Sequence, residues 1–284
     1  MSVFEGVVGQ DAAAAALARH LDVTRGAGGT LIVGPEGVGR FLLAHRAARA
    51  ILGATPESAA RVESLQHADL LVLEPGEGID GVRDAAELLV RRPVEGERTV
   101  LIVRDLERFS LPALNALLKT LEEPPAGAAI ILIAEGTELL PETIVSRCRI
   151  VRTRALTRDE TRKVLEAKGA PPELAEDADG SPGRALARQG LGIDAGSLLA
   201  LFDAAHPDPL GQVDKIVRHR PGEENDAHRR RLAELLQAAA ARLRRQLPDH
   251  EAALRSVLEA LGSLEANANA GIVFSDLVLR ARHG

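Results

Sequence analysis

The sequence predicts an α/β fold over its first 155 residues and an all-helical part behind them. Two observations support this prediction. Short runs of Leu, Ile and Val recur in the first part without alternating with polar residues, and helix-forming stretches separate them. Continuous apolar runs are typical of strands buried on both faces, as in a parallel sheet covered by helices. After residue 155 only helical patterns continue.

Five stretches are the expected strands. TLIVG, LLVLEP, TVLIV and IILIA are clear, and CRIVR is weaker. Three helices are expected among them, because these segments are dense in strong helix formers or place leucines at helical spacing. The strands cover 30–34, 70–75, 99–103, 130–134 and 148–152, and the helices cover 11–21, 40–52 and 111–125. Strands that alternate with helices predict a parallel sheet between helical layers.

A small helical unit is expected over residues 156–192. Thr157 is followed three residues later by Glu160, which is the capping-box signature of a helix start. Ser181 stands directly before a proline, as the N-cap of a later helix would. These signals predict short helices with well-defined beginnings.

The remaining residues are expected to be all-helical, with leucines at helical spacing over 229–247 and 251–269. Segments 206–211 and 220–226 are rich in Pro, Gly and Asp and are expected to be connections. Three consecutive arginines at 229–231 could touch nucleic acid, but the acidic residues just before them favour a solvated helix face. The expected domains are residues 1–155, 156–192 and 193–284.

Composition excludes several classes of protein. Aromatic residues make up 2% of the chain, without Trp or Tyr, so a site that stacks nucleobases on rings is not expected. The net charge of −6 argues against non-specific nucleic-acid binding. Cys148 is the single cysteine, so neither a disulfide within the chain nor a multi-thiolate zinc site can form. Without a signal-peptide pattern or a membrane-spanning apolar run, a cytoplasmic protein is expected.

The segment GPEGVGRF is close to a phosphate-binding loop, which requires G-x-x-x-x-G-K-[ST] between a strand and a helix. Gly34, Gly37 and Gly39 provide the glycine framework, but Arg40 stands at the lysine position and Phe41 at the hydroxyl position. A phenyl ring cannot ligate Mg²⁺, and arginine does not replace lysine at a phosphate. Two interpretations stay open: a tight turn without a ligand, or residual nucleotide or phosphate binding.

A second segment shows a matching loss. Enzymes with this loop hold Mg²⁺ through an acidic residue at the end of a neighbouring strand. After TVLIV the chain has Arg104 and Asp105, so a cation stands where the metal ligand is needed. The two losses together predict a chain without a metal, without a required cofactor and without ATP hydrolysis of its own.

Several motifs, taken in order, resemble the bacterial clamp-loader branch of the AAA+ family, and within it the delta-prime type. They read VVGQDAAAAAL, GPEGVGR, HADLLVLEP, NALLKTLEEPP, IVSRC and GSPGRAL. The resemblance covers about the first 190 residues, and the last helices look like a collar domain. It implies an AAA+ α/β domain, a helical lid and a collar that holds the chain in a ring. The implied partners are gamma/tau-type ATPase and delta-type subunits and, through the complex, the sliding clamp and primed DNA.

The resemblance assigns the chief functional role to Arg147 of the Ser-Arg-Cys motif. In the family this arginine projects into the ATP site of a neighbouring subunit, where it stabilises charge on the transferred phosphoryl group. The alternative is that Arg147 pairs locally near the start of the fifth strand. Ser146 and Cys148 are its motif neighbours, and we expect both to be structural.

Other positions follow from the same resemblance. Arg184 lies on the expected lid helix and is either a second sensor of nucleotide or a surface arginine. Gln10 lies in the N-terminal box and either caps the first helix or holds the loop, and Gly136 falls near a sensor position that is polar in active members. Many members carry a four-cysteine zinc module before the second strand. Here His67 alone cannot form one, and it is expected to be a loop residue.

Three functions are therefore open. The first is a non-catalytic clamp-loader subunit that provides Arg147 in trans as part of the polymerase assembly. The second is an ATP-binding or ATP-hydrolysing subunit of the gamma type. The third is a degenerate AAA+ scaffold outside replication, which would not associate with clamp-loader ATPases.

Overall fold

The structure is a computed structural model that describes residues 3–23, 28–53, 55–176, 178–190, 195–219 and 225–283. Its contacts divide the chain into two compact units, Met1–Glu160 and Thr161–Gly284. Each unit has its own apolar cores. The finer division into three domains stays a prediction.

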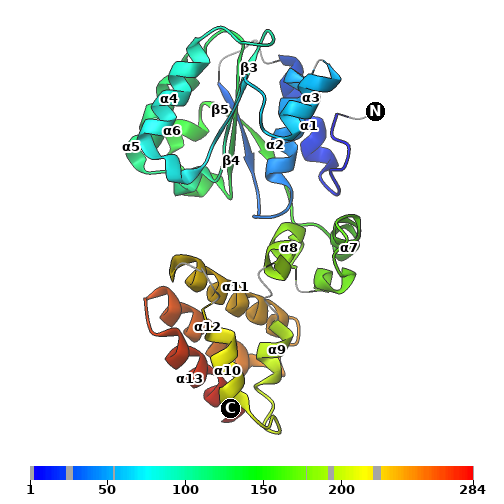
Figure 1. The fold of residues 1–284 in the computed structure, drawn as a ribbon, viewed down its shortest axis with the longest axis vertical. Coiled ribbons are helices and arrows are strands. Elements are labelled where there is room, and N and C mark those ends of the chain that lie inside the picture. Colours follow the sequence, from blue (N-terminus) through cyan, green and yellow to red (C-terminus); the bar gives the residue numbers. More distant parts are fainter. Residues whose placement is uncertain are drawn as a thin grey trace. The chain divides into compact units, whose positions relative to one another are not determined.

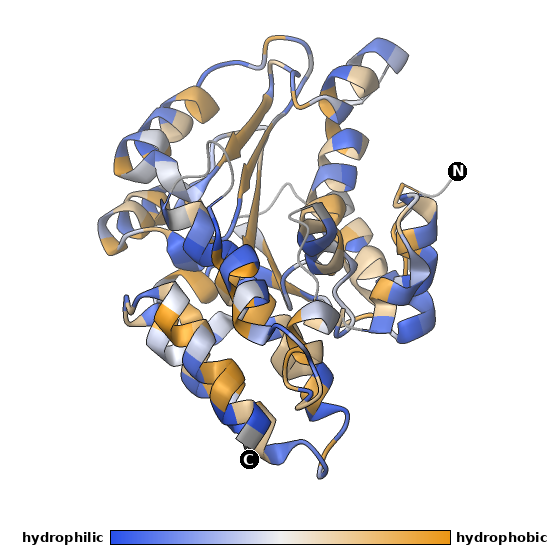
Figure 2. Ribbon diagram, turned by 60° about the horizontal axis from the view of Figure 1, so that its bottom comes forward, coloured by the Kyte–Doolittle hydropathy of each residue, from blue (hydrophilic) through white to orange (hydrophobic). Residues whose placement is uncertain are grey.

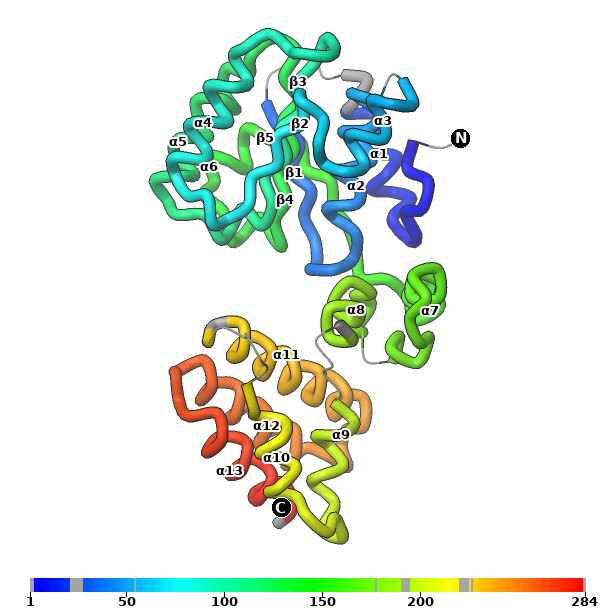
Figure 3. Tube along the Cα trace, viewed as in Figure 1, coloured from blue at the N-terminus to red at the C-terminus, as the bar shows by residue number. Residues whose placement is uncertain are grey.

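The first unit is built on a parallel sheet between two helical layers (Figure 1). In the described part of the chain this sheet has five strands in the order β2-β3-β4-β1-β5, which Figure 3 traces along the chain. The strands are β1 (Gly29–Val33), β2 (Leu70–Leu73), β3 (Thr99–Val103), β4 (Ala128–Ala134) and β5 (Cys148–Arg152). The predicted α/β class is confirmed, and each expected strand lies within two residues of its predicted bounds.

Strand residues alternate between two apolar cores, which explains why the strands are apolar throughout. Leu31, Leu101 and Leu132 pack on one face. Ile32 and Ile102 pack on the other, and Figure 2 shows the strands as the most hydrophobic part of this unit. The second face carries α1 (Asp11–Val23), α2 (Arg40–Leu52) and α3 (Pro56–Glu63), and the first carries α4 (Gly78–Val90), α5 (Leu111–Glu122) and α6 (Glu142–Val145).

Three of these helices, α3, α4 and the short α6, were not predicted. The signal for α3 was present, because Thr55 accepts a hydrogen bond from the Ser58 N–H as N-cap and a proline follows it. Helix α4 contains two glycines in its first turn, which weakens its helical pattern. Short 3₁₀ turns complete the unit: η1 (Pro75–Glu77), η2 (Leu106–Arg108) and η3 (Thr137–Leu139).

The second unit contains helices and their connections, and no strand, in the part of the chain that the structure describes. Its smaller core gathers residues from Leu165 to Ala185, and its larger core gathers residues from Ala195 to Val278. The predicted N-caps are confirmed, since Thr157 and Glu160 exchange backbone and side-chain hydrogen bonds and Ser181 Oγ accepts from the Arg184 N–H. Helix α7 (Arg158–Ala167) begins in the last residues of the first unit and continues into the second. The other elements are η4 (Pro172–Glu176), α8 (Pro182–Gly190), α9 (Ala195–Ala200), α10 (Pro209–Val217), α11 (Asn225–Arg244), α12 (Glu251–Glu265) and α13 (Ala270–His283).

Some helical details differ from the prediction. The expected connection 206–211 contains the start of α10. Residues 220–224 of the other connection lie outside the described residues, and its last two residues begin α11. The arginine triplet is not a purely solvated face, because Arg231 is buried and donates to the carbonyls of Ile216 and Arg218 at the end of α10. Carbonyls at a helix end have no partner within the helix, so a buried guanidinium can satisfy them.

Within the described residues, no helix combines the length and the apolar character that crossing a membrane requires.

Candidate functional site

The glycine loop between β1 and α2 has the backbone shape that its sequence predicts. Gly34, Gly37 and Gly39 all have positive φ angles, of 148°, 74° and 102°. A Cβ atom on Gly34 would lie 2.1 Å from Thr153 Oγ1, so the first glycine is required by the close approach of the residue after β5 as well as by its φ angle. The loop therefore keeps a conformation that other residues would not support.

Gln10 holds this loop in place. Its buried carboxamide donates to the Arg154 carbonyl at 2.7 Å and to the Val38 carbonyl at 3.3 Å, and it accepts from the Arg154 N–H at 3.2 Å. Of the two roles left open for this residue, the structure therefore shows the one in which it holds the loop.

The residues that depart from a working phosphate loop interact with one another. The buried Arg40 lies 3.7 Å from Asp105. Arg104 stacks its guanidinium 4.5 Å from the centre of the Phe41 ring and pairs with Glu74 at 2.6 Å. Asp105 thus balances the charge of Arg40, and Glu74 balances that of Arg104, whose guanidinium also covers the Phe41 ring.

Glu107 adds a further carboxyl group to this region. Burial raises the pKa of Glu107, while the nearby Arg40 guanidinium opposes that shift and Asp105 reinforces it. One oxygen of Glu107 and Nη1 of Arg40 are buried without hydrogen-bond partners. The region therefore holds two unsatisfied buried polar atoms even though its main charges are paired.

These side chains do not fit a Mg²⁺ ion. Mg²⁺ requires oxygen ligands in an octahedral arrangement, and Phe41 and Arg104 offer none. Asp105 already faces the buried Arg40. Among the described residues, no group of three or more His, Cys, Asp or Glu is gathered as a metal site would need.

Arg147 lies at the amino ends of the strands, whereas the loop lies at their carboxyl ends. It directly precedes β5, whose first residue is paired with Gly29 at the start of β1, whereas the loop follows the end of β1. A five-residue strand spans roughly 16 Å. The arginine and the glycine loop of this unit therefore cannot meet at one ligand.

Local contacts hold the Arg147 side chain in a defined position. Nη2 lies 2.6 Å from Oε1 of Glu122, at the end of α5, and Nη1 donates to the Thr143 carbonyl at 2.8 Å. About 35% of the side chain remains exposed. It borders an open pocket of about 520 Å³ that Gly28, Glu122 and the Ser-Arg-Cys motif also line. The local pairing that we kept as an alternative is thus present in the structure.

The two neighbours of Arg147 each have a local environment of their own, and their structural role stays a prediction. The Ser146 hydroxyl donates to the Thr143 carbonyl at 3.2 Å. Burial raises the pKa of the Cys148 thiol to about 11, which keeps it protonated and unreactive at neutral pH.

Arg184, on α8, is engaged by α11 in the second unit. Its Nη2 donates to Oε1 of Gln237 at 2.7 Å and lies 4.0 Å from Glu234. These contacts are sufficient to explain its orientation, and its role toward a nucleotide stays a prediction. Gly136, the other sensor-like position, immediately precedes η3.

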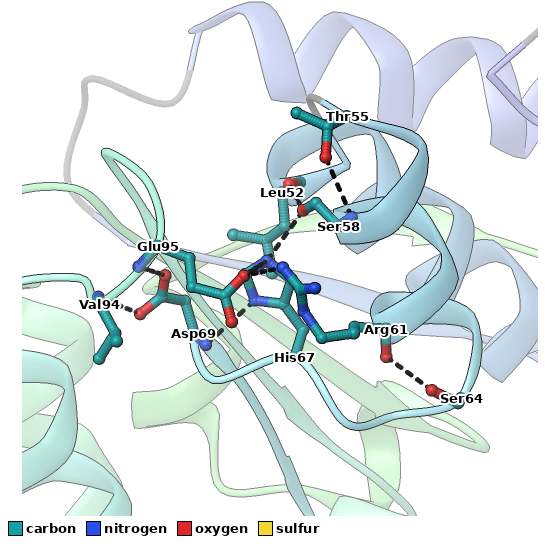
Figure 4. A network of polar contacts seen from close by, with 9 residues as sticks. All are labelled: Leu52, Thr55, Ser58, Arg61, Ser64, His67, Asp69, Val94 and Glu95. Atoms are coloured by element: carbon teal, nitrogen blue, oxygen red, sulfur yellow. Dashed lines mark hydrogen bonds and ion pairs between the residues drawn. The ribbon is translucent and has the colours of Figure 1, made fainter.

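His67 lies in the loop before β2, as predicted, but it is buried in a polar network (Figure 4). Its Nδ1 accepts from the Asp69 N–H at 3.1 Å, so Nε2 carries the proton and faces Ser58 Oγ at 3.0 Å. The buried Asp69 carboxylate accepts from the N–H groups of Val94 and Glu95. This network fixes the loop before β3 and gives a structural role to the segment that lacks zinc ligands.

Sequence reasoning missed Glu122 and Gly28. The signal for Glu122 was a pair of adjacent glutamates at the C-terminal end of a helix, where the helix dipole disfavours negative charge. Gly28 has a φ of 101°, and a Cβ atom there would lie 2.4 Å from the Arg147 carbonyl oxygen. No sequence pattern indicated that contact.

Comparisons with known proteins identify relatives of this chain. The family model described as DNA polymerase III, delta subunit, matches residues 9–157. Subunit tau of DNA polymerase III from Salmonella typhimurium is 29% identical over 268 residues, which cover 84% of this chain and 40% of that protein. Subunit delta' from Pseudomonas aeruginosa is 34% identical over 132 residues, covering 42% of this chain and 40% of that protein. The chain thus spans about two fifths of the length of these relatives.

Solved structures show the same fold. A DNA polymerase III gamma subunit-related protein from Thermotoga maritima superposes with a TM-score of 0.56 at 20% identity, over 94% of this chain and 98% of that one. Thermotoga maritima RuvB superposes with a TM-score of 0.50 at 18% identity, over 98% and 89%. At these identities the likeness concerns the AAA+ fold alone.

Proposed function

The chain belongs to the clamp-loader family of DNA polymerase III subunits, and on that premise we propose that it is a non-catalytic ring subunit of the delta-prime type. It does not hydrolyse ATP itself. It presents Arg147 to the ATP site of an adjacent gamma/tau-type subunit, and acts in the cytoplasm with a delta-type subunit to load the sliding clamp onto primed DNA.

The observation that carries this proposal is the position of Arg147 relative to the chain's own loop. The arginine lies at the amino ends of the parallel strands and the loop lies at their carboxyl ends, and β1 spans roughly 16 Å between the two. A phosphoryl group that Arg147 contacts must therefore belong to another subunit. Because the side chain is partly exposed beside an open pocket, it is accessible to such a neighbour.

The state of the chain's own loop supports the same proposal. Arg40 and Asp105 pair with each other, and Arg104 covers the Phe41 ring, so the positions that would receive phosphates and Mg²⁺ are engaged within the unit. A chain that does not hydrolyse ATP can still contribute to hydrolysis in a neighbouring subunit, because an arginine supplied in trans raises the rate by about 10³–10⁵-fold in known systems.

The experiment is single-turnover ATP hydrolysis by a loader reconstituted with its DNA, comparing the native chain with Arg147→Ala after assembly has been verified. We expect hydrolysis at the served site to fall by about 10³-fold. Arg152→Ala is the control, because it removes an arginine that is exposed and lies at the other end of β5. If the loader with Arg147→Ala hydrolysed ATP at the native rate, Arg147 would have no role in catalysis.

A second candidate, an ATP-binding or ATP-hydrolysing gamma/tau-type subunit, is favoured by one observation. The similarity to a tau subunit extends over 84% of this chain, whereas the similarity to the delta' relative covers 42%. Mg²⁺-dependent ATP turnover by the isolated chain, lost in Arg40→Ala, would favour this candidate over the first.

A further inference from the structure

Helix α5 ends in two adjacent glutamates, and the structure pairs one of them with Arg147. We propose that Glu122 is a positioning residue for Arg147, holding its guanidinium in the orientation that a neighbouring subunit's phosphoryl group requires. This inference rests on the proposed role of Arg147. It adds a second residue of this chain to a reaction that takes place in another subunit.

The Arg147 backbone is fixed first. Its carbonyl accepts a hydrogen bond from the Gly29 N–H at 3.2 Å, at the start of β1. The Gly28 backbone also packs closely against this carbonyl, since a Cβ atom at that position would lie 2.4 Å from its oxygen. Only the side chain of Arg147 is then free to vary, and its long stem would otherwise sample many rotamers.

Two contacts from different elements restrict that side chain. The Thr143 carbonyl of α6 accepts from Nη1 at 2.8 Å, and the Glu122 carboxylate of α5 lies 2.6 Å from Nη2. Anchors on both terminal nitrogens determine the plane of the guanidinium as well as its location. A carboxylate matches that planar fork better than a neutral group does.

The anchors leave Arg147 able to bind an anion. A guanidinium carries five N–H donors. The contacts to Glu122 and Thr143 use two of them, and Nη1 also lies 3.4 Å from Ser146 Oγ, so at least two donors stay available. The side chain remains about one third exposed at the border of an open pocket of about 520 Å³. Glu122 thus restricts the arginine without covering it, which is the arrangement expected of a support for a functional residue.

The helix end gives an independent reason to assign Glu122 a role. Negative charge at a helix C-terminus is disfavoured by the helix dipole, and α5 places two carboxylates there. Glu123 is exposed and, among the described residues, has no ion pair, whereas Glu122 faces Arg147. The two neighbouring glutamates therefore differ in their contact with the arginine, and Glu123 provides a matched control.

The experiment is single-turnover ATP hydrolysis by the reconstituted loader with its DNA, using Glu122→Gln and Glu123→Gln in the native and the Arg147→Ala backgrounds. Glutamine keeps the shape of the side chain and removes its charge. We expect Glu122→Gln to lower the hydrolysis rate constant by about threefold to tenfold, as expected for a loosened catalytic group. The apparent KM for ATP and the assembly of the ring should stay unchanged, and Glu123→Gln should behave like the native chain.

The Arg147→Ala background separates positioning from structure. If Glu122 acts through Arg147, its replacement has no further effect once the arginine is gone, because coupled residues are not additive. An equal loss in both backgrounds, a native rate or a faster rate for Glu122→Gln would each overturn the inference while leaving the role of Arg147 intact. A native rate for Arg147→Ala itself would instead overturn the proposed function.

Discussion

Replacing Asp105 by asparagine is expected to destabilise the first unit by about 1–2 kcal/mol, because it leaves a buried cation unbalanced. Arg40 is 5% exposed, its Nη2 lies 3.7 Å from Asp105 Oδ1, and its Nη1 is buried without a hydrogen-bond partner. Asp105 has a φ of 45°, in the left-handed region that asparagine also tolerates. The substitution therefore removes the charge with little effect on the backbone.

The magnitude follows from the distance and the exposure of the two groups. Unit charges 3.7 Å apart interact by roughly 4.5 kcal/mol at an effective dielectric constant of about 20. Asp105 is 27% exposed, so water screens part of that energy. Glu107 also compensates, because the charge of Asp105 contributes to its raised pKa and the loss of that charge makes Glu107 easier to ionise beside Arg40.

Urea unfolding followed by far-ultraviolet circular dichroism measures this loss, since the chain has no Trp or Tyr for fluorescence. Hydrogen exchange of peptides from α2 and β3 localises it to the first unit. The control is Arg40→Met combined with Asp105→Asn, which removes the buried cation as well and should recover stability. A loss below about 0.5 kcal/mol, or a double variant less stable than the single one, would refute the reasoning.

Three further predictions concern other polar contacts and a close backbone approach. The pKa of Glu160 is lowered to about 2, chiefly by the hydrogen bond from Arg154, so its carboxylate stabilises the fold above pH 4.5 and loses that effect as the pH falls toward 2. Glu160→Gln should therefore flatten the decline of stability across this window in acid unfolding, and an unchanged slope would contradict the assignment. Asp69→Asn should lower the free energy of unfolding by about 1.5–3 kcal/mol and speed hydrogen exchange in the loop before β3, because the two backbone N–H groups bond to different oxygens of Asp69 and an amide replaces one of these with an NH2 donor. Native exchange in that loop would contradict this. Gly28→Ala should lower the melting temperature, because alanine is strained at this positive φ and its Cβ would overlap the Arg147 carbonyl. Gly96→Ala, at an open position, should leave the melting temperature unchanged.

Much of the first unit could be predicted because its signals are local. Strands covered on both faces must be apolar throughout, so LIV runs identified all five strands of the described sheet. The replaced positions Arg40, Phe41 and Arg104 could be identified for a similar reason, because a phosphate loop fixes residue types at a fixed spacing. N-caps at Thr157 and Ser181 were visible because the capping residue and its partner lie within three positions.

Contacts between distant segments could not be predicted in this way. Nothing in the spacing indicates that Arg104 lies over Phe41, since 63 positions separate them and the strand order brings them together. The burial of Arg231 depends on where α10 ends, and the partner of Arg147 depends on where α5 ends. Helix α4 was missed because tertiary packing against β2 and β3 outweighs the poor helix propensity of its glycines.

The geometry also explains why a loop without its phosphate chemistry would keep its glycines. Gln10 ties the loop to the segment after β5, and Gly34 packs directly against Thr153. Those contacts secure the carboxyl end of β5, the strand whose amino end carries Arg147. Because β1 and β5 are paired along their whole length, a distortion of the loop would be transmitted through the same strand pair. On the proposed role of Arg147, a well-formed glycine loop would therefore help to place the arginine, whether or not the loop binds a phosphate.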